Sequence, residues 1–250
     1  MTPAVFVVDA GLLAAADVGT ELVLDGAEGR HATKVRRLRP GEQVDLVDGT
    51  GLRCAGRVSR SDGGKLVVRL TARLVEPVPQ PQLIVVQALV KGDAADEAVR
   101  TMTEVGVDGI VPWTAAHSVV RWDAGRAAAA RHRWQQIARE AGKQARRARF
   151  PEIAEVATTA EVCRRLRGAA LGIVLLETAS ERVGGVTVPR AGDVVVVVGP
   201  EGGFRDDEVD AFRSAGAVFV RLGPTVLRAA TAGTVAAGIL LSRTDRWHGD

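Results

Sequence analysis

Apolar and polar residues alternate along the first third of the chain. Between residues 42 and 75 the apolar positions form short stretches of period two, such as Val44 and Leu46, which are broken by glycine-containing sequences at 48–51 and 62–64. Alternation of this kind, interrupted by tight turns, is typical of short strands that bury one face. The pattern predicts a small antiparallel β-barrel.

A proline-rich stretch ends this pattern. Three of the ten prolines fall within five residues, at positions 77, 79 and 81, where they continue neither a strand ladder nor a helix. We therefore expect a first domain at 1–75, a linker at 76–82 and a second domain at 83–250.

The second domain alternates short apolar runs with segments of helical length. This order predicts an α/β domain whose parallel sheet is covered on both faces. The predicted strands cover residues 83–89, 109–112, 170–176, 194–198 and 218–222, and the predicted helices cover 93–105, 124–148, 158–167, 206–215 and 226–242.

Positive charge is concentrated on one predicted helix and its flanks. Residues 121–149 contain nine Lys or Arg and two acidic residues, a net charge of +7 in a chain whose total is +3. Trp134, Ala138 and Ala141 recur at helical spacing, so one side of the helix should pack while the other stays free for a partner. A polyanion would be attracted by that charge, and a solvated helix face is the alternative. The basic residues of this helix include Arg131, Arg139, Lys143, Arg146 and Arg147.

Composition and cysteine content indicate the kind of compartment in which the protein is expected. The 250 residues are 46% hydrophobic and 25% charged, as in globular proteins, and no run approaches the roughly 18 apolar residues of a membrane span. The first residues lack the basic region of a secretory signal. Two cysteines, Cys54 and Cys163, lie far apart without a CxxC motif, which favours a reducing compartment. We expect a cytoplasmic protein without a membrane partner.

Several kinds of chemistry lack their usual motifs. The four histidines show no spacing typical of metal ligands, so no metal site is expected. The sequence contains no GxGxxG, GxxxxGK[ST] or GxSxG motif. Cys54 and Cys163 fall in a predicted strand and a predicted helix, where small core residues are more common than nucleophiles.

A glycine-rich sequence, GPEGGF at 199–204, directly follows the predicted strand 194–198. Ligands of open α/β sheets bind at the carboxyl ends of strands, and glycines allow close approach of the backbone. A tight strand-to-helix turn is the alternative. We assign the acidic residues at 206–208 to the start of the next helix, which leaves Glu201 as a candidate for function.

A second unusual sequence occupies residues 222–232. It is apolar and bent by glycine and proline, and it carries one isolated cation, Arg228, at the start of a strongly apolar helix. Arg228 is either a helix-end charge or a functional group, and we favour function because apolar and small residues follow it.

Taken in order, these residues and others resemble the bacterial 16S ribosomal RNA (uracil(1498)-N(3))-methyltransferases, which belong to the trefoil-knotted SPOUT superfamily. The similarity runs almost from end to end. It rests on His31 with Val35, Arg37, Pro40 and Gly41, on Lys91-Gly92-Asp93, on Thr103-Glu104-Val105-Gly106-Val107, on Ser118-Val119-Val120, on Arg133-Trp134 with Ile137, on Glu140-Ala141 and Gln144, on Pro151-Glu152-Ile153, and on the sequences at 199–204 and 222–232.

The chain departs from the family pattern at several positions. Thr101 stands where the family often has Lys, and His117 replaces an Arg before Ser118. Ala230 stands where the family has Glu, so no catalytic role is transferred to that position.

The resemblance implies a PUA-like β-barrel followed by a SPOUT α/β domain with a trefoil knot and a parallel sheet. It implies S-adenosylmethionine as cofactor, 16S ribosomal RNA of the small subunit as substrate, and a homodimer in which each RNA site lies near the partner's cofactor pocket. The residues that it assigns to cofactor binding are Leu175, Leu176, Gly199, Glu201, Gly202, Gly203, Leu222, Gly223, Val226 and Leu227.

Methylation of uracil N3 requires an unpaired or flipped base that has lost its N3 proton. Direct displacement needs no enzyme nucleophile, so alignment is the main task. Arg228 is the candidate for stabilising charge on the ring oxygens, and Glu201 either accepts the proton or orients its loop. The residues expected to bind RNA are Arg30, His31, Lys34, Arg36, Arg37, Lys91, Arg131, Arg139, Lys143, Arg146 and Arg147.

Three alternatives stay open. A SPOUT methyltransferase could act on another RNA or another atom. A ribosome-assembly factor without enzyme activity would bind RNA but not the cofactor. A small-molecule transferase would keep its turnover after charge reversal on the helix 124–148, and we rank it last.

Overall fold

The computed structural model describes residues 2–248 of the chain, and these fold into two compact units. The first unit extends to Val78 and also includes Gly142–Phe150. The second unit comprises Pro79–Ala141 and the chain from Pro151 onwards. The predicted domains, 1–75 and 83–250, placed residues 142–150 in the second domain, whereas in the structure these residues belong to the first unit.

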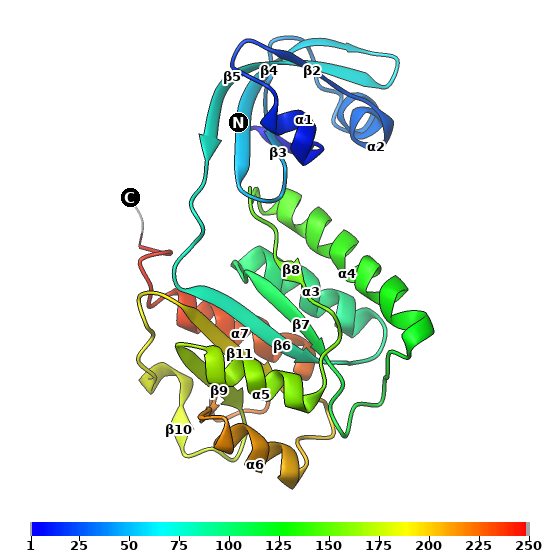
Figure 1. The fold of residues 1–250 in the computed structure, drawn as a ribbon. Helices are drawn as coiled ribbons and strands as arrows, with labels where there is room; N and C mark the ends of the chain where they lie inside the picture. The colour runs from blue at the N-terminus through cyan, green and yellow to red at the C-terminus, as the bar shows by residue number, and fades with distance from the viewer. Residues whose placement is uncertain (1, 249–250) are drawn as a thin grey trace. The chain divides into compact units, whose positions relative to one another are not determined.

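A five-stranded sheet forms the first unit (Figure 1). Its inner face carries buried side chains such as Phe6, Leu46 and Val68. Successive side chains of a strand point to opposite faces, and on the other face Val7 and Val47 are buried in a second cluster. All neighbouring strands are antiparallel except β1 and β3. In spatial order the strands are β1 (Ala4–Val7), β3 (Gln43–Val47), β4 (Leu52–Asp62), β5 (Lys65–Val75) and β2 (Glu21–Leu24), so the strands predicted between residues 42 and 75 are confirmed.

Short helical pieces lie before β3 and were not predicted. They are α1 (Ala10–Ala14), α2 (Gly26–Arg30) and a π-helical turn at His31–Val35. Five residues are too few for a helical hydrophobic period to be recognised in a sequence. Just after the π-helical turn, Arg37 has a φ of 52°, which places its backbone in the left-handed region that side chains rarely adopt.

The returning segment Gly142–Phe150 completes the first unit. Ala148 is fully buried against valines of β1 and β3, and its carbonyl accepts a hydrogen bond from the Gly51 amide at 2.9 Å. A Cβ atom on Gly49 would lie 2.8 Å from the Phe150 ring, and Gly49 has a φ of 81°. The turn between β3 and β4 therefore needs glycine for both its conformation and its contact with this segment.

The second unit is a seven-stranded sheet in which every neighbouring pair of strands is parallel. Figure 1 shows α5 on one side of this sheet and α3 and α7 on the other. In spatial order the strands are β10 (Glu181–Arg182), β12 (Val218–Arg221), β9 (Leu171–Leu175), β11 (Asp193–Val198), β6 (Gln82–Ala88), β7 (Gly109–Trp113) and β8 (Glu152–Ile153). The helices are α3 (Asp93–Val105), α4 (Ala124–Gln144), α5 (Thr159–Gly168), α6 (Asp206–Ser214) and α7 (Ala229–Leu241).

The valine run of β11 explains why this sheet is buried on both faces. Val194, Val196 and Val198 pack into the core beneath α3, α4 and α7, whereas Val195 and Val197 pack into the core beneath α5 and α6. An uninterrupted apolar strand is what a central parallel strand requires.

The strands and helices predicted for the second domain are confirmed to within one residue, except at two helix ends. α7 begins at Ala229 rather than at 226, because residues 222–228 form a loop that bends at 223–225. α4 ends at Gln144 rather than at 148, because the chain turns at Arg146, which has a φ of 58°. β8, β10 and a 3₁₀ turn at Val183–Gly185 are two or three residues long and were not predicted. The trefoil knot stays a prediction.

Within residues 2–248, no helix is both long enough and apolar enough to cross a membrane.

The packing of the returning segment leads to a first prediction. We expect Phe150→Ala to lower the free energy of unfolding by about 2 kcal/mol, below the usual cost for a fully buried aromatic ring because Phe150 is only half-buried. Hydrogen exchange should quicken at the amides of β1 and β3 and stay unchanged in β6 and β11. The exposed Val119→Ala serves as the control. Unaltered exchange in β1 and β3 would show that the first unit is stable without this contact.

Candidate cofactor site

Three strands of the second unit end at the same level. Val198 of β11 is in register with Leu175 of β9, and Leu175 is in register with Val220 of β12. The loops that follow these strands therefore leave the sheet side by side, at the edge where ligands of open α/β sheets bind.

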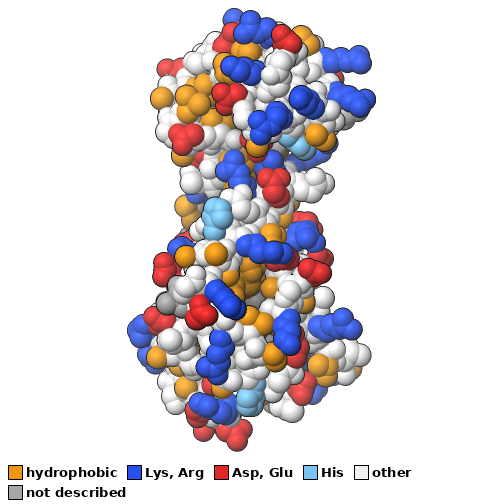
Figure 2. Space-filling view, turned by 90° about the vertical axis from the view of Figure 1, so that its right-hand side faces the viewer, with side chains coloured by type: hydrophobic (Ala, Val, Ile, Leu, Met, Phe, Trp, Pro, Cys, Tyr) orange, Lys and Arg blue, Asp and Glu red, His pale blue; other side chains and the backbone are white. Residues whose placement is uncertain are grey.

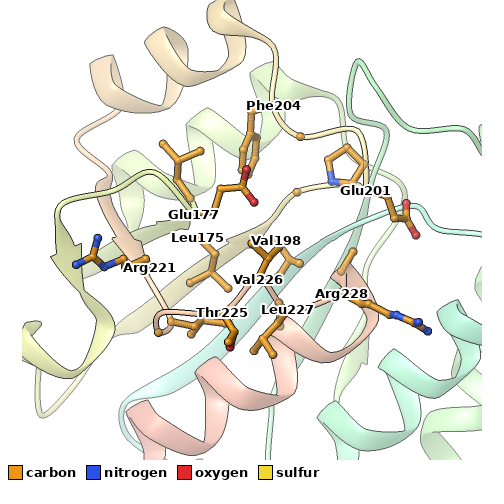
Figure 3. Close-up of a pocket in the computed structure, with 18 of the residues that line it drawn as sticks. Leu175, Glu177, Val198, Glu201, Phe204, Arg221, Thr225, Val226, Leu227 and Arg228 are labelled. Carbon is orange, nitrogen blue, oxygen red and sulfur yellow. The ribbon is translucent and has the colours of Figure 1, made fainter.

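Between these loops lies a cavity of about 510 Å³, shown in Figure 3. All ten residues that the family resemblance assigns to the cofactor line it, and so do both candidates for catalysis, Glu201 and Arg228. The structure thus brings the sequences 199–204 and 222–228 together. Ten further lining residues had not been assigned to the cofactor: Glu177, Val198, Val220 and Arg221 lie outside the two sequences singled out above, whereas Pro200, Phe204, Pro224, Thr225, Ala229 and Ala232 lie within them.

A tight turn shapes the glycine loop after β11. The Gly203 amide donates to the Pro200 carbonyl at 2.9 Å, and Gly203 has a φ of 72°, in the region that favours glycine. At Gly199, a Cβ atom would lie 2.8 Å from the Phe204 ring. Glycine at 199 therefore lets Phe204 fold back over its own loop.

Phe204 is held by an aromatic cluster. Its ring stacks on Trp113 of β7 with centroids 5.9 Å apart and an interplanar angle of 25°, and Phe212 of α6 meets Trp113 edge-on at 5.5 Å. Trp113 and Phe212 are fully buried. The chain has only nine Trp and Phe residues, so the position of Trp113 directly after the predicted strand 109–112, at the edge where ligands bind, was the signal that could have identified this support.

Glu208 joins the glycine loop to the loop after β7. It is only 2% exposed, and its Oε2 accepts a hydrogen bond from the Arg205 amide at 3.0 Å, at the start of α6. Its Oε1 accepts from the Ala116 amide at 2.8 Å and from the Thr159 hydroxyl at 3.4 Å. The prediction that acidic residues at 206–208 serve the helix start is confirmed for Glu208, which also has this second, longer-range role.

The third loop ends at Arg228, the N-cap residue of α7. Its carbonyl accepts hydrogen bonds from the amides of Thr231 and Ala232, both at 3.0 Å. Its guanidinium is exposed and has no hydrogen bond or ion pair with any residue that the structure describes. In Figure 3, Arg228 and Glu201 extend from their loops on the same side of the cavity, whereas Glu177 lies at another wall near Phe204.

A buried glutamine lies at the level of these strand ends. Gln87 of β6 is in register with Val198 and is fully buried, and its Nε2 donates to the carbonyls of Ala88 at 3.1 Å and Ala229 at 3.4 Å. Its Oε1 has no partner among the residues described here. Gln87 therefore connects the end of β6 to the start of α7.

The basic residues predicted on the first unit are exposed. Figure 2 shows Lys and Arg side chains gathered on one face of that unit. His31 is exposed as well, and its ring meets the buried Phe6 edge-on with centroids 6.2 Å apart. The exposed basic residues near the π-helical turn are Arg30, Lys34, Arg36 and Arg37, and Lys91 is exposed in the second unit.

The expectation of a free basic side on α4 is wrong for two residues. Lys143 forms an ion pair with Glu28 at 2.8 Å, and the two side chains are only 11% and 17% exposed. Arg131 donates from Nε to the Ile153 carbonyl at 2.8 Å and pairs with Glu155 at 3.2 Å. Acidic residues distant in sequence neutralise these cations, which the local charge count did not reveal. Arg139 and Arg147 also interact within the protein, while Arg146 is exposed.

Neither cysteine is a candidate nucleophile. Cys54 and Cys163 are buried, and burial raises the pKa of both thiols, which disfavours the reactive thiolate. No group of three or more His, Cys, Asp or Glu side chains suited to a metal ion is found within residues 2–248.

Family models match both parts of the chain. Residues 76–241 match the model described as an RNA methyltransferase domain, and residues 24–71 match the RNA methyltransferase PUA domain. The PUA match confirms the predicted class of the first unit, and the parallel sheet confirms the predicted α/β class of the second.

Relatives and solved structures agree with these matches. The chain is 43% identical to the ribosomal RNA small subunit methyltransferase E of Mycobacterium bovis over 92% of this chain and 90% of the relative, and 29% identical to that of Bacillus subtilis over 91% and 92%. A putative methyltransferase of Legionella pneumophila, solved with bound S-adenosylmethionine, has a TM-score of 0.84 at 25% identity over 98% of this chain and 99% of that chain. The fold is also shared with the ribosomal RNA small subunit methyltransferase E of Neisseria gonorrhoeae, at a TM-score of 0.83 and 24% identity over 96% of this chain and 98% of that chain. The chain therefore belongs to the RNA methyltransferase family, among the ribosomal RNA small subunit methyltransferases E.

Proposed function

We propose that this protein transfers a methyl group from S-adenosylmethionine to N3 of uracil 1498 in 16S ribosomal RNA of the small subunit. Membership of the family makes it an RNA methyltransferase, and its relatives carry the name of small-subunit enzymes. The observation that carries the proposal is the cavity in which the sequences 199–204 and 222–228 lie side by side.

The cavity suits S-adenosylmethionine in size and chemistry. Its volume of about 510 Å³ falls within the roughly 300–1,000 Å³ of small-molecule sites. Leu175, Val198 and Leu227 supply apolar walls for an adenine ring, and the loops supply backbone amides for polar atoms. A Cβ atom on Gly223 would meet no protein atom within 4 Å, so the backbone there is open to a ligand.

When bound, S-adenosylmethionine supplies an electrophilic methyl group on a sulfonium. The protein holds the acceptor nitrogen in line with that methyl group and excludes water. Arg228, unpaired at the rim of the cavity, stabilises negative charge on the uracil oxygens once the N3 proton is lost. Glu201 extends on the same side and accepts that proton or orients the glycine loop.

Phosphate contacts come from the exposed basic residues of the first unit, which include Arg146, and from Lys91 of the second unit. The chain has no tyrosine and few other aromatic residues, so recognition rests on phosphate positions and RNA shape rather than on stacking. The target base must leave any pairing before N3 becomes accessible.

The proposal includes a trefoil knot through the three loops of the cavity and a homodimer in the cytoplasm. Val226, 73% exposed at the cavity rim, and Val235 on α7 are apolar side chains that a second subunit would cover.

Cofactor binding is the first part of the proposal to test. We expect one-site binding of S-adenosylmethionine by calorimetry and no measurable binding by Gly223→Trp, because the indole fills the cavity. The matched control is Gly168→Trp at the end of α5, where a Cβ atom also meets nothing within 4 Å. RNA binding by a wild-type protein that does not bind the cofactor would instead indicate a ribosome-assembly factor without enzyme activity.

Methyl transfer is the second part. We expect labelled methyl to move to small subunits purified from a strain that lacks this gene, with all label on N3 of uracil 1498 by mass spectrometry. Arg228→Gln should lower kcat about 100-fold while its affinity for the cofactor stays within about threefold, because the lost cation acts on developing charge. The exposed Arg164→Gln on α5 is the control. Label on another nucleotide would reject uracil 1498 as the target but would still show methyl transfer to RNA.

A further inference from the structure

A fourth segment, outside the three loops that line the cavity, touches the glycine loop. His117, in the loop after β7, has its Nδ1 atom 3.1 Å from the Gly202 carbonyl oxygen. A Cβ atom on Gly202 would lie 3.0 Å from the His117 Cβ and 3.4 Å from the His117 carbonyl oxygen. The two loops are thus in van der Waals contact, and glycine at 202 permits their close approach.

The loop that carries His117 is well supported. Its Thr114 amide donates to the Ala157 carbonyl at 3.1 Å, its Ala116 amide donates to buried Glu208 at 2.8 Å, and its Ala115 is fully buried. His117 itself is exposed. The imidazole is therefore presented from a fixed backbone, and its substitution should leave the core unchanged.

The contact also fixes the tautomer of the ring. A carbonyl oxygen only accepts hydrogen bonds, so Nδ1 must carry the proton. Protonation of Nε2 would leave this donation in place.

The peptide between Gly202 and Gly203 is held at both ends. Its carbonyl accepts from His117, and its N–H donates to the Pro200 carbonyl at 2.9 Å. Because a peptide unit is planar, two bonds on opposite sides fix its orientation, and with it the direction of the neighbouring backbone groups in the cavity wall. An ordered loop binds its ligand with less loss of conformational entropy than a loop that must become ordered on binding.

We propose that His117 is a positioning residue of the cofactor site, which acts through the Gly202 carbonyl to hold the glycine loop in its binding conformation. This inference rests on the proposed binding of S-adenosylmethionine. His117 stands where the family pattern has Arg, and the inference gives this residue a role. The segment that carries His117 does not line the cavity itself.

The test uses two substitutions, each of which places a side-chain amide nitrogen near the position of one of the two ring nitrogens. An Asn side chain can place an amide N–H near the position of Nδ1, whereas a Gln side chain places it near that of Nε2. By calorimetry with S-adenosylmethionine we expect about fivefold weaker binding for His117→Ala, the loss of about one neutral hydrogen bond. His117→Asn should restore wild-type affinity, His117→Gln should not, and all three should keep the wild-type Tm.

His132→Ala is the matched control, because His132 is another exposed histidine and its Nε2 lies 3.4 Å from the Gln136 side-chain amide nitrogen of its own helix. Unchanged affinity in His117→Ala, or equal affinity in His117→Asn and His117→Gln, would overturn the inference. A merely structural role would lower Tm in all three variants without separating Asn from Gln.

A measurement without cofactor separates this inference from the proposed function. Two-dimensional ¹⁵N–¹H correlation of the imidazole rings should show the Nδ1–H form for His117 in the unliganded protein, and the Nε2–H form would overturn the inference. Wild-type protein that fails to bind S-adenosylmethionine would reject the proposed function, whatever the tautomer. If the wild-type protein binds S-adenosylmethionine and His117→Ala binds it equally well, only the role of His117 is rejected.

Discussion

The register between three parallel strands is the constraint on which the cofactor site depends. Leu175, Val198 and Val220 lie in one row across the sheet, so the loops that follow them begin at the same level and enclose a common cavity. A shift of one residue in β11 would draw Asp193 or Gly199 into the buried part of the strand and move the glycine loop out of this row. The core packing that stabilises the sheet therefore also sets the geometry of the site.

The cavity loops are supported from strands and helices that do not bind the cofactor. Trp113 of β7 stacks on Phe204, and Glu208 of α6 connects the start of its helix to the loop after β7. Gln87 is fully buried and donates to the carbonyls of Ala88 and Ala229, which connects β6 to the start of α7. Buried hydrogen bonds of this kind give the cavity loops a fixed geometry.

The sequence predicted the second unit well because its signals are local. The apolar run at 194–198 and the glycine loop after it identify a buried strand and its ligand edge without knowledge of the fold. The return of residues 142–150 to the first unit depends on contacts of Ala148 and Phe150 with a turn about 100 residues away, which no local pattern contains. For the same reason the pairing of Lys143 with Glu28 was missed, and a charge count overestimated the free basic side of α4.

Backbone amide shifts during a titration test the central claim most directly, because they report each loop separately. On addition of S-adenosylhomocysteine, the account predicts that the amides of Glu201, Gly202 and Gly223 shift together and saturate at one equivalent. The amides of Gly49 and Gly51 in the first unit should not move. Saturable shifts confined to only one of the two loops, or centred outside the second unit, would contradict a cavity shared by both.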